Sequence, residues 1–304
     1  MTDVVQIGAK RAPSSERRPP WLRVKVSRTT TYQEVGELLD GLKLNTVCQE
    51  ARCPNIWECW GEHRTATLMI LGDICTRNCR YCSVTSGRPL PLDPEEPEHV
   101  AEAVHRLALR HVVLTSVDRD DLADFGAGHW ISTIEAVRRQ NPEARIELLT
   151  PDFGDDAALL RRVFDARPNV FGYNTETVPR LFARMRPRGS YAGTMQLLSR
   201  LDAMRRETGA PMTTKSGLML GLGETRDEVL AVMDDLREVH CDVLTLGQYL
   251  NPTQKHAPIA RFYALEEFAE LRAEGLRRGF RHVESGPLVR SSYHAHEHVP
   301  GEER

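Results

Sequence analysis

The sequence predicts an α/β fold, in which helices cover a mainly parallel sheet. After residue 65, apolar strand-like runs alternate with helical stretches, and such alternation implies parallel strands joined by helical crossovers, as an open sheet or a barrel. The chain has 304 residues, of which 40% are hydrophobic, enough for one large domain or two small ones. In either architecture, functional groups gather at the carboxyl ends of the strands.

Each element is predicted from its hydrophobic pattern. Six apolar runs are predicted as strands, at residues 65–71, 111–116, 145–150, 169–174, 212–220 and 242–248. Helices are predicted at residues 94–110, 128–140, 155–167, 195–208 and 225–240. Thr225 and Glu228 have the spacing of a capping box at the start of the last helix. A further short helix is expected near residue 32, because Tyr32, Val35 and Leu39 recur at helical spacing.

Composition and charge argue against several classes of protein. The net charge of -3 and the pI of about 6.4 give no global basic field, so no nucleic-acid partner is expected. No run approaches the ~18 apolar residues of a membrane span, and no signal-peptide core is present, so we expect a soluble, cytoplasmic protein without a membrane partner. Residues 1–28 are rich in Arg, Lys, Pro and Ser and predict a flexible or clamping arm; a solvated tail or a mitochondrial presequence is the alternative.

Three cysteines on one short loop indicate a metal centre. Cys75, Cys79 and Cys82 have Cys-x3-Cys-x2-Cys spacing and follow the first predicted strand. A cubane of four irons needs four terminal ligands, so a loop with three thiolates leaves one iron free to bind another group. Structural zinc sites usually collect two pairs of ligands, and no distant second pair is present. The alternatives are a zinc loop or a reduced thiol cluster without metal.

A second group of three thiols precedes the first. This group has Cys-x4-Cys-x5-Cys spacing and consists of Cys48, Cys53 and Cys59. It too could supply three thiolates to a four-iron cluster and leave one iron for another ligand. The alternative is a zinc site completed by His63. Tryptophans around these thiols would shield a cluster from water. The seventh cysteine, Cys241, is expected to be a small buried apolar residue. Six cysteines between residues 48 and 82 suit metal binding in a reducing compartment better than disulfides.

The cysteine loop resembles the signature of radical S-adenosylmethionine (SAM) enzymes, because Tyr81 precedes the last cysteine of the motif. The resemblance implies that Cys75, Cys79 and Cys82 hold a 4Fe–4S cluster and that SAM chelates its fourth iron. Reductive cleavage of SAM would then give methionine and a 5'-deoxyadenosyl radical, which abstracts a hydrogen atom. It also implies a partial (β/α)6 barrel, open at one side.

A narrower resemblance is to the lipoyl synthase family, carried by EARCPNIWECW and TATLMILGDICTRNCRYC between residues 48 and 89. It implies that two sulfur atoms are inserted at C6 and C8 of an octanoyl chain linked to a lysine of a lipoyl carrier protein domain. A second 4Fe–4S cluster on Cys48, Cys53 and Cys59 would donate the sulfur, and a flavodoxin or ferredoxin could supply electrons. One alternative is another radical SAM sulfur-inserting enzyme, and the other is a non-enzymatic iron–sulfur or zinc protein.

Polar residues at the strand ends are candidate contacts to SAM. By the same resemblance they are, with Tyr81 of the cysteine loop, Ser116, Asp118, Asn174, Glu176 and Lys215. A solvated acidic loop is the alternative for the first strand end, and a surface ion pair is the alternative for Lys215. Gly172 and Tyr173 depart from the Asn and His that the family usually has there.

The Arg-Ser-Ser-Tyr segment, residues 290–293, would read as a turn or a helix cap from spacing alone. The family resemblance implies instead that Ser292, or else Ser291, gives an oxygen ligand to the second cluster. Oxygen is a harder and poorer ligand for cluster iron than thiolate, so it can leave.

The chain is expected to have an N-terminal extension (residues 1–62), a radical SAM barrel (63–280) and a C-terminal extension (281–304). Three arginines on and just after a predicted helix could meet an acidic carrier surface, with a solvated helix face as the alternative. They are Arg184, Arg186 and Arg188.

Overall fold

The computed structural model describes residues 4–5, 18–22, 24–25, 29–62, 66–293 and 295. The chain forms two compact units. The described residues of the first fall within Met1–Val5, Val24–Arg77 and Ser83–Phe171. Those of the second fall within Gln6–Arg23, Asn78–Cys82 and Gly172–Arg304. His63 and most of the predicted N-terminal arm lie outside the described residues.

The sheet of the first unit is mainly parallel. Its strands, in spatial order, are β3 (Asn45–Thr46), β4 (Thr67–Ile70), β7 (His111–Ser116) and β8 (Arg145–Leu149). β4, β7 and β8 are parallel to one another, whereas β3 is antiparallel to β4. Two further pairs of short strands are β1 (Val4–Val5) with β2 (Val24–Lys25), and β5 (Ile74–Cys75) with β6 (Thr85–Ser86). β9 (Val170–Gly172) begins in the first unit and ends in the second.

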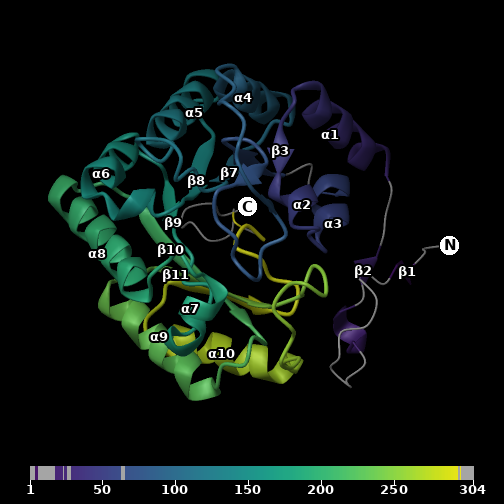
Figure 1. Ribbon diagram of the computed structural model, residues 1–304, viewed down its shortest axis with the longest axis vertical. Helices are drawn as coiled ribbons and strands as arrows, with labels where there is room; N and C mark the ends of the chain where they lie inside the picture. Colours follow the sequence, from purple (N-terminus) through teal and green to yellow (C-terminus); the bar gives the residue numbers. More distant parts are fainter. Residues whose placement is uncertain are drawn as a thin grey trace. The chain divides into compact units, whose positions relative to one another are not determined.

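Helices pack on this sheet through apolar faces. They are α1 (Thr30–Gly41), α2 (Val47–Glu50), α3 (Ile56–Gly61), α4 (Glu96–Arg106), α5 (Ala127–Gln140), the 3-10 helix η2 (Phe153–Asp155) and α6 (Ala157–Asp165). α4 and α5 lie side by side (Figure 1). Trp130 and Ile134 of α5 are fully buried, as are Leu114 and Leu148 of the sheet. Each such side chain contributes about 1.5–3 kcal/mol by leaving water, so this interior holds the strand ends of the first unit in place.

The second unit has three parallel strands in the order β10 (Thr213–Leu220), β11 (Val243–Gln248) and β12 (His282–Gly286). Its helices are η1 (Pro20–Leu22), α7 (Pro179–Met185), α8 (Tyr191–Thr208), α9 (Arg226–Glu238) and α10 (Leu265–Arg277). Gly247 of β11 is needed for a close approach, because a Cβ there would lie 2.1 Å from the carbonyl oxygen of Val289. The segment after β12 is therefore pressed against β11.

The elements predicted from the sequence are confirmed, with ends that shift by a few residues. All six predicted strands are present as β4 and β7 to β11, the first predicted range beginning at residue 65, just outside the described residues. The capping box at Thr225 is confirmed, since its hydroxyl accepts from the Glu228 N–H and the Glu228 carboxylate accepts from the Thr225 N–H. Cys241 is fully buried as expected. α10 and β12 lie outside the predicted elements. Over the described residues, no helix has the length and apolar character to cross a membrane.

Candidate functional site

The chain bends at Leu71 and Gly72, between β4 and the cysteine loop. Leu71 and Gly72 both have positive φ, 71° and 91°, a conformation that is strained for leucine. Two buried side chains hold this turn: Glu96 Oε2 accepts the Leu71 N–H at 2.8 Å, and Arg119 Nη1 donates to the Leu71 carbonyl at 3.2 Å. Glu96 Oε2 also lies 2.6 Å from His129 Nε2. The turn thus fixes where the cysteine loop begins.

Cys75 is held on both sides by backbone hydrogen bonds of the first unit. Its strand β5 pairs with β6, and the Gly87 N–H donates to the Cys75 carbonyl at 2.9 Å. Its Sγ accepts from the N–H of Arg77 at 3.4 Å and from the N–H of Asp118 at 3.3 Å. Thr76 links the same two segments, because its N–H and hydroxyl both donate to the Asp118 carbonyl. The sulfur therefore sits against the carboxyl end of β7 with two donors directed at it.

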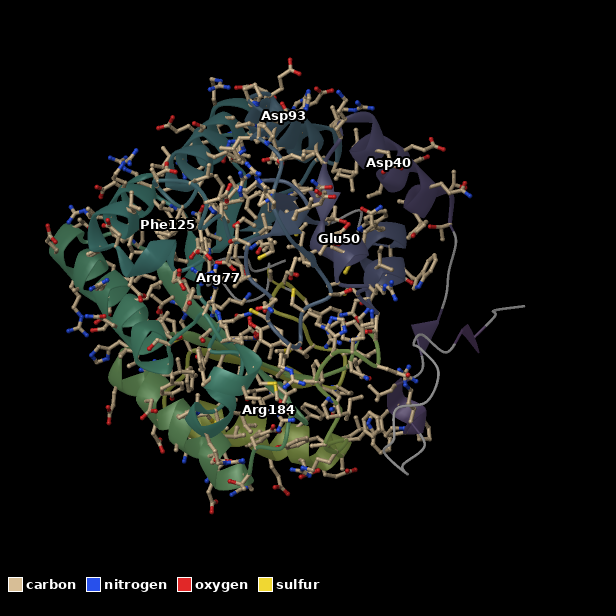
Figure 2. The ribbon with its side chains drawn as sticks, in the orientation of Figure 1. Asp40, Glu50, Arg77, Asp93, Phe125 and Arg184 are labelled. Carbon is tan, nitrogen blue, oxygen red and sulfur yellow. The ribbon has the colours of Figure 1, made fainter. Side chains whose placement is uncertain are left out.

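Arg77 is buried, whereas Asp40 and Asp93 of the same unit are exposed (Figure 2). Its guanidinium donates to Asp120 at 2.7–3.1 Å and to Asp152 at 2.6 and 2.7 Å. A carboxylate oxygen of Asp118 lies 3.4 Å away. Burial alone would lower the pKa of Arg77, but the hydrogen bonds to Asp152 and Asp120 raise it, so the guanidinium stays charged.

The charge state of Cys75 reflects these neighbours. Burial raises the pKa of its thiol, and the negative charge of Asp118 raises it further, whereas the N–H donors and the charge of Arg77 lower it. A metal that binds Cys75 must therefore displace a proton from the sulfur.

The second triad is also in the first unit. Cys48 lies on α2, whose N-cap Thr46 accepts from the Gln49 N–H at 3.2 Å, and Cys59 lies on α3. Burial raises the pKa of Cys48 to about 12, and the charge of Cys53 adds to the effect. The pKa of Cys59 is raised by burial and by the charges of both other thiols. The negative charge of a neighbouring thiol of the triad thus contributes to the raised pKa of both Cys48 and Cys59.

Aromatic residues of α3, which carries Cys59, pack near the second triad. Trp57 stacks on Tyr32 with ring centroids 4.6 Å apart. The indole N–H of Trp60 lowers the pKa of the Cys48 thiol by facing it, and this buried N–H has no regular hydrogen bond among the described residues. A cluster sulfur beside Cys48 would give that donor a partner. The donor set, three thiols and one indole N–H, thus fits an iron–sulfur cluster in its chemistry.

Within the part of the chain that the structure describes, no three His, Cys, Asp or Glu side chains already have the arrangement of a metal-ion site. The cysteine loop is also divided between the units, with Cys75 in the first and Cys79 and Cys82 in the second.

In the second unit, the backbone around Cys79 and Cys82 is held by several hydrogen bonds. The Arg80 N–H donates to the Met185 carbonyl at 2.9 Å, and the Ala257 N–H donates to the Arg80 carbonyl at 2.8 Å. His256 Nε2 lies 2.8 Å from the Cys82 carbonyl, and its Nδ1 lies 2.8 Å from the Thr253 hydroxyl. A carbonyl only accepts, so Nε2 carries the proton and Nδ1 accepts from Thr253. His256 thereby positions the last cysteine of the loop.

Several predicted SAM contacts also lie in the second unit. Asn174 Nδ2 donates to Ser291 Oγ at 2.7 Å and to Glu176 Oε1 at 3.2 Å, so these three side chains lie together. Burial, with the nearby charges of Glu176 and Cys79, raises the pKa of Tyr81 well above its usual value. The pKa of Glu176 is raised by burial, against the opposing charge of Arg186. Lys215 is buried in β10, with 2% of its surface exposed.

In the first unit, the Ser116 hydroxyl donates to the Val117 carbonyl at 2.8 Å, and the Asp118 side chain faces Cys75 and Arg77. Ser292 lies in the turn that follows β12 of the second unit.

The prediction of a basic surface set is wrong for one of its three arginines. Arg184 and Arg188 are exposed, but Arg186 is only 7% exposed. Its guanidinium lies 4.9 Å from the ring centroid of Tyr173, and Nη1 donates to the Asn174 carbonyl at 3.4 Å. α7 ends at Met185, so the next residue turns inward and gains a cation–π contact.

Four polar residues near the cysteines were not among the predicted site residues: Arg77, Asp120, Asp152 and His256. The position of Arg77 between two of the cysteines was a usable signal, as was the acidic run at residues 118–121. The role of Asp152 has no local signal, because its partner is 75 residues away in the chain.

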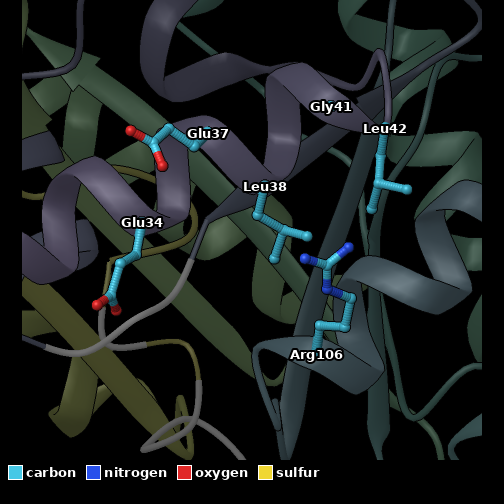
Figure 3. Close-up of a pocket in the computed structure, with 6 residues that line it drawn as sticks. All are labelled: Glu34, Glu37, Leu38, Gly41, Leu42 and Arg106. Carbon is cyan, nitrogen blue, oxygen red and sulfur yellow. The ribbon is translucent and has the colours of Figure 1, made fainter.

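A shallow pocket of about 370 Å³ lies elsewhere in the first unit (Figure 3). Glu34, Glu37 and Leu38 of α1 line it, and Arg106 reaches in from α4. Its lining residues differ from all the predicted site residues, so it is not the candidate site.

Known structures share the fold of this chain. A crystal structure of methylornithine synthase is 14% identical with a TM-score of 0.51, and the match covers 87% of this chain and 85% of that chain. The Streptococcus suis protein SuiB bound to S-adenosylmethionine is 12% identical with a TM-score of 0.55, covering 83% and 59%. A family model for the radical SAM superfamily matches residues 69–236. The chain is a member of this superfamily, and the predicted α/β radical SAM fold is confirmed.

The narrower family follows from closer relatives. A model for the N-terminal domain of lipoyl synthase matches residues 6–53. The lipoyl synthase of Rubrobacter xylanophilus is 52% identical over 92% of this chain and 86% of its own length. That of Chloroflexus aggregans is also 52% identical, over 93% and 91%. The chain therefore belongs to the lipoyl synthase family, as the sequence motifs predicted. It is a radical SAM sulfurtransferase, and its family implies a 4Fe–4S cluster and SAM as cofactors.

Proposed function

We propose that this protein inserts two sulfur atoms, at C6 and C8, into an octanoyl group that is amide-linked to a lysine of a lipoyl carrier domain. The proposal rests on family membership and on one observation above all: Cys48, Cys53 and Cys59 form a second thiol group with its own helices and its own aromatic cover. A radical SAM enzyme with a single cluster needs no such group. A second cluster that is consumed in the reaction would explain where the inserted sulfur comes from.

The ligand sets follow from this proposal. Cys75, Cys79 and Cys82 bind the cluster that binds SAM, while Cys48, Cys53, Cys59 and Ser292 bind the sacrificial cluster. When bound, the first cluster and SAM supply the 5'-deoxyadenosyl radical that removes hydrogen atoms from the octanoyl chain. The protein itself buries Cys48 and directs N–H donors at Cys75.

We propose Ser292 as the oxygen ligand of the second cluster because the family resemblance implies it. Ser291 Oγ accepts a hydrogen bond from Asn174, which also donates to Glu176. Ser291 thereby positions the strand-end pair of Asn174 and Glu176.

That pair is suited to the polar groups of SAM, since an amide and a carboxylate can bind ribose hydroxyls or an ammonium group. Four other residues complete the proposed set of SAM contacts: Tyr81, Ser116, Asp118 and Lys215. The pKa of Glu176 is raised by burial, and a cationic ammonium group beside it would favour its ionised form.

We propose that the enzyme works in the cytoplasm with octanoylated carrier domains and with an electron donor such as a flavodoxin or ferredoxin. Residues 1–62 and 281–304 would act as extensions that supply the ligands of the second cluster, and residues 63–280 as the radical SAM core.

The test is anaerobic turnover of an octanoyl-lysine peptide with SAM and a reductant, followed by mass spectrometry. Reconstituted protein should hold about eight irons per chain, as two four-iron clusters. Replacing Cys48, Cys53 and Cys59 by alanine should halve the iron and leave reductive SAM cleavage, but no product should gain sulfur. Replacing Cys75, Cys79 and Cys82 should abolish SAM cleavage. Sulfur insertion by the first variant would refute the assignment of the donor.

A further inference from the structure

The first unit contains a buried group of charges next to Cys75. One guanidinium, that of Arg77, faces the carboxylates of Asp118, Asp120 and Asp152, whose side chains are 17%, 20% and 9% exposed. Arg77 itself is 6% exposed. Two of these carboxylates bind the guanidinium in a bidentate manner, the geometry that makes such pairs strong and directional. All three carboxylates lie within ion-pair distance of Arg77.

This charge group is connected to Cys75 through two backbone hydrogen bonds. Arg77 and Asp118 are the two residues whose backbone N–H groups donate to the Cys75 sulfur. Their side chains also face each other, with 3.4 Å between Nη1 and Oδ1. The Arg77 carbonyl in turn accepts from the Ser86 hydroxyl at 2.8 Å, which ties the segment to β6. Movement of the guanidinium would therefore change the position of both donors.

Positive and negative charges around Cys75 affect the reduction of a bound cluster in opposite directions. A cluster that accepts an electron becomes more negative, and nearby carboxylates oppose this whereas a nearby cation favours it. Asp118 Oδ2 lies 3.8 Å from Cys75 Sγ, so a thiolate in that position would face a negative neighbour. Arg77 is the cation that offsets it. N–H donors to a ligand sulfur also favour the reduced cluster, because they stabilise the added negative charge.

We propose that Arg77 is a positioning residue that keeps the two backbone N–H donors on Cys75 and, by its charge, holds the reduction potential of the SAM-binding cluster above the value that Asp118, Asp120 and Asp152 would otherwise set. The inference rests on the proposed function in one respect, that Cys75 is a cluster ligand. Arg77, which lies between the first two cysteines of the loop, would thus help a low-potential one-electron donor to reduce the cluster.

The test is a redox titration of the full-length chain, followed by electron paramagnetic resonance of the reduced cluster. The Cys48, Cys53 and Cys59 alanine background removes the second cluster, so a single signal is observed. Arg77→Gln should shift the midpoint potential to a more negative value, whereas Asp152→Asn should shift it to a less negative value. Arg77→Lys keeps the charge without the bidentate geometry and should lie between Arg77→Gln and the parent.

Arg138→Gln is the matched control. Arg138 is in the same unit and donates to the carbonyls of Ala166 and Arg167, which precede β9 and so lie at the amino end of a strand rather than at a carboxyl end. It loses the same charge and two hydrogen bonds, and its midpoint potential should match that of the parent.

Opposite shifts for Arg77→Gln and Asp152→Asn support the proposal, because general loosening of the loop would move both in one direction. Parental potentials at matched iron content, or shifts in the same direction, overturn it. If Arg77→Gln fails to retain iron, Asp152→Asn and Arg77→Lys decide by the same criteria. Cys75→Ala in the same background should abolish the signal; a retained signal would instead refute the ligand set of the proposed function.

Discussion

At the scale of single residues, the hydrogen bonds of the site assign different tasks to neighbouring side chains of the same type. The Ser291 hydroxyl accepts from Asn174 in the second unit, which gives it a positioning role. Arg184 and Arg186 are two residues apart, yet one is exposed and the other is buried against Tyr173. Such differences in hydrogen bonding and burial decide which residue of a motif is functional, and the residue type alone does not reveal them.

Ser292→Cys should retain the second cluster but slow or stop the release of its sulfur. A thiolate is a softer ligand than a hydroxyl oxygen and should hold the fourth iron more firmly. Single-turnover sulfur transfer at matched iron content measures this. Ser291→Cys is the comparison, and any loss that it causes should come from weaker SAM binding rather than from retained cluster sulfur, because Ser291 holds Asn174. Parental yields from both variants would mean that the Arg-Ser-Ser-Tyr segment is only a turn.

At the scale of helices and strands, local signals predicted most elements of the fold. β4, β7 and β11 are rich in apolar residues because both of their faces are buried, and these apolar stretches are visible in the sequence. β12 is different: its sequence, HVESG, has a single fully buried residue, Val283, and it forms by pairing with β11. α10 has buried Phe268 and Leu271 at helical spacing, but many charged residues surround them. Pairing between distant segments was the missing information.

The turn at Leu71 should depend on one buried carboxylate. Glu96→Ala leaves the Leu71 N–H without its acceptor and should destabilise the fold by about 2–4 kcal/mol, as the loss of a buried charged partner does. Urea unfolding followed by circular dichroism measures the loss. Glu98→Ala is the control on the same helix, because Glu98 is exposed and pairs with exposed Arg139. Equal midpoints for the two variants would mean that the turn is held by other contacts.

The start of α9 should show a pH-dependent stability. Arg180 and the Thr225 N–H lower the pKa of Glu228 from 4.5 to about 2. The folded state therefore favours the ionised carboxylate, and this contribution is present above pH 4.5 and is lost as the pH falls toward 2. Because the pair is largely exposed, Glu228→Gln should cost less than about 1 kcal/mol at pH 7. Thermal unfolding of both proteins should differ at pH 7 and converge only as the pH falls to about 2; a constant difference would contradict this origin.

At the scale of the whole molecule, the cysteine spacings predicted the family and the kind of chemistry. They did so because cluster ligands must lie on short loops, so the chemistry is encoded in consecutive residues. The surroundings of those ligands are not encoded in this way. Asp120 and Asp152 lie 43 and 75 residues from Arg77 in the chain, and they meet it only because β7 and β8 are parallel neighbours whose carboxyl ends share an edge. The burial of Arg186 likewise depends on residues of another segment, Tyr173 and Asn174, which local sequence around Arg186 does not reveal.

The exposed arginines near α7 are expected to contribute to the recognition of a whole carrier domain. Charge reversal of Arg184 and Arg188 together should lower kcat/KM for an acidic octanoylated carrier by about tenfold at low salt, because oppositely charged surfaces accelerate association. The effect should shrink as salt is added. A short octanoyl-lysine peptide lacks the carrier surface and should react at the parental rate.

Arg186→Glu provides the contrast in this experiment. It would place a carboxylate against the ring of Tyr173 and remove the donor to the Asn174 carbonyl, so it should lower the unfolding temperature and impair both substrates equally. The double variant at Arg184 and Arg188 should keep the parental unfolding temperature. If it loses activity equally on carrier and peptide, or on neither, the carrier does not bind this part of the second unit.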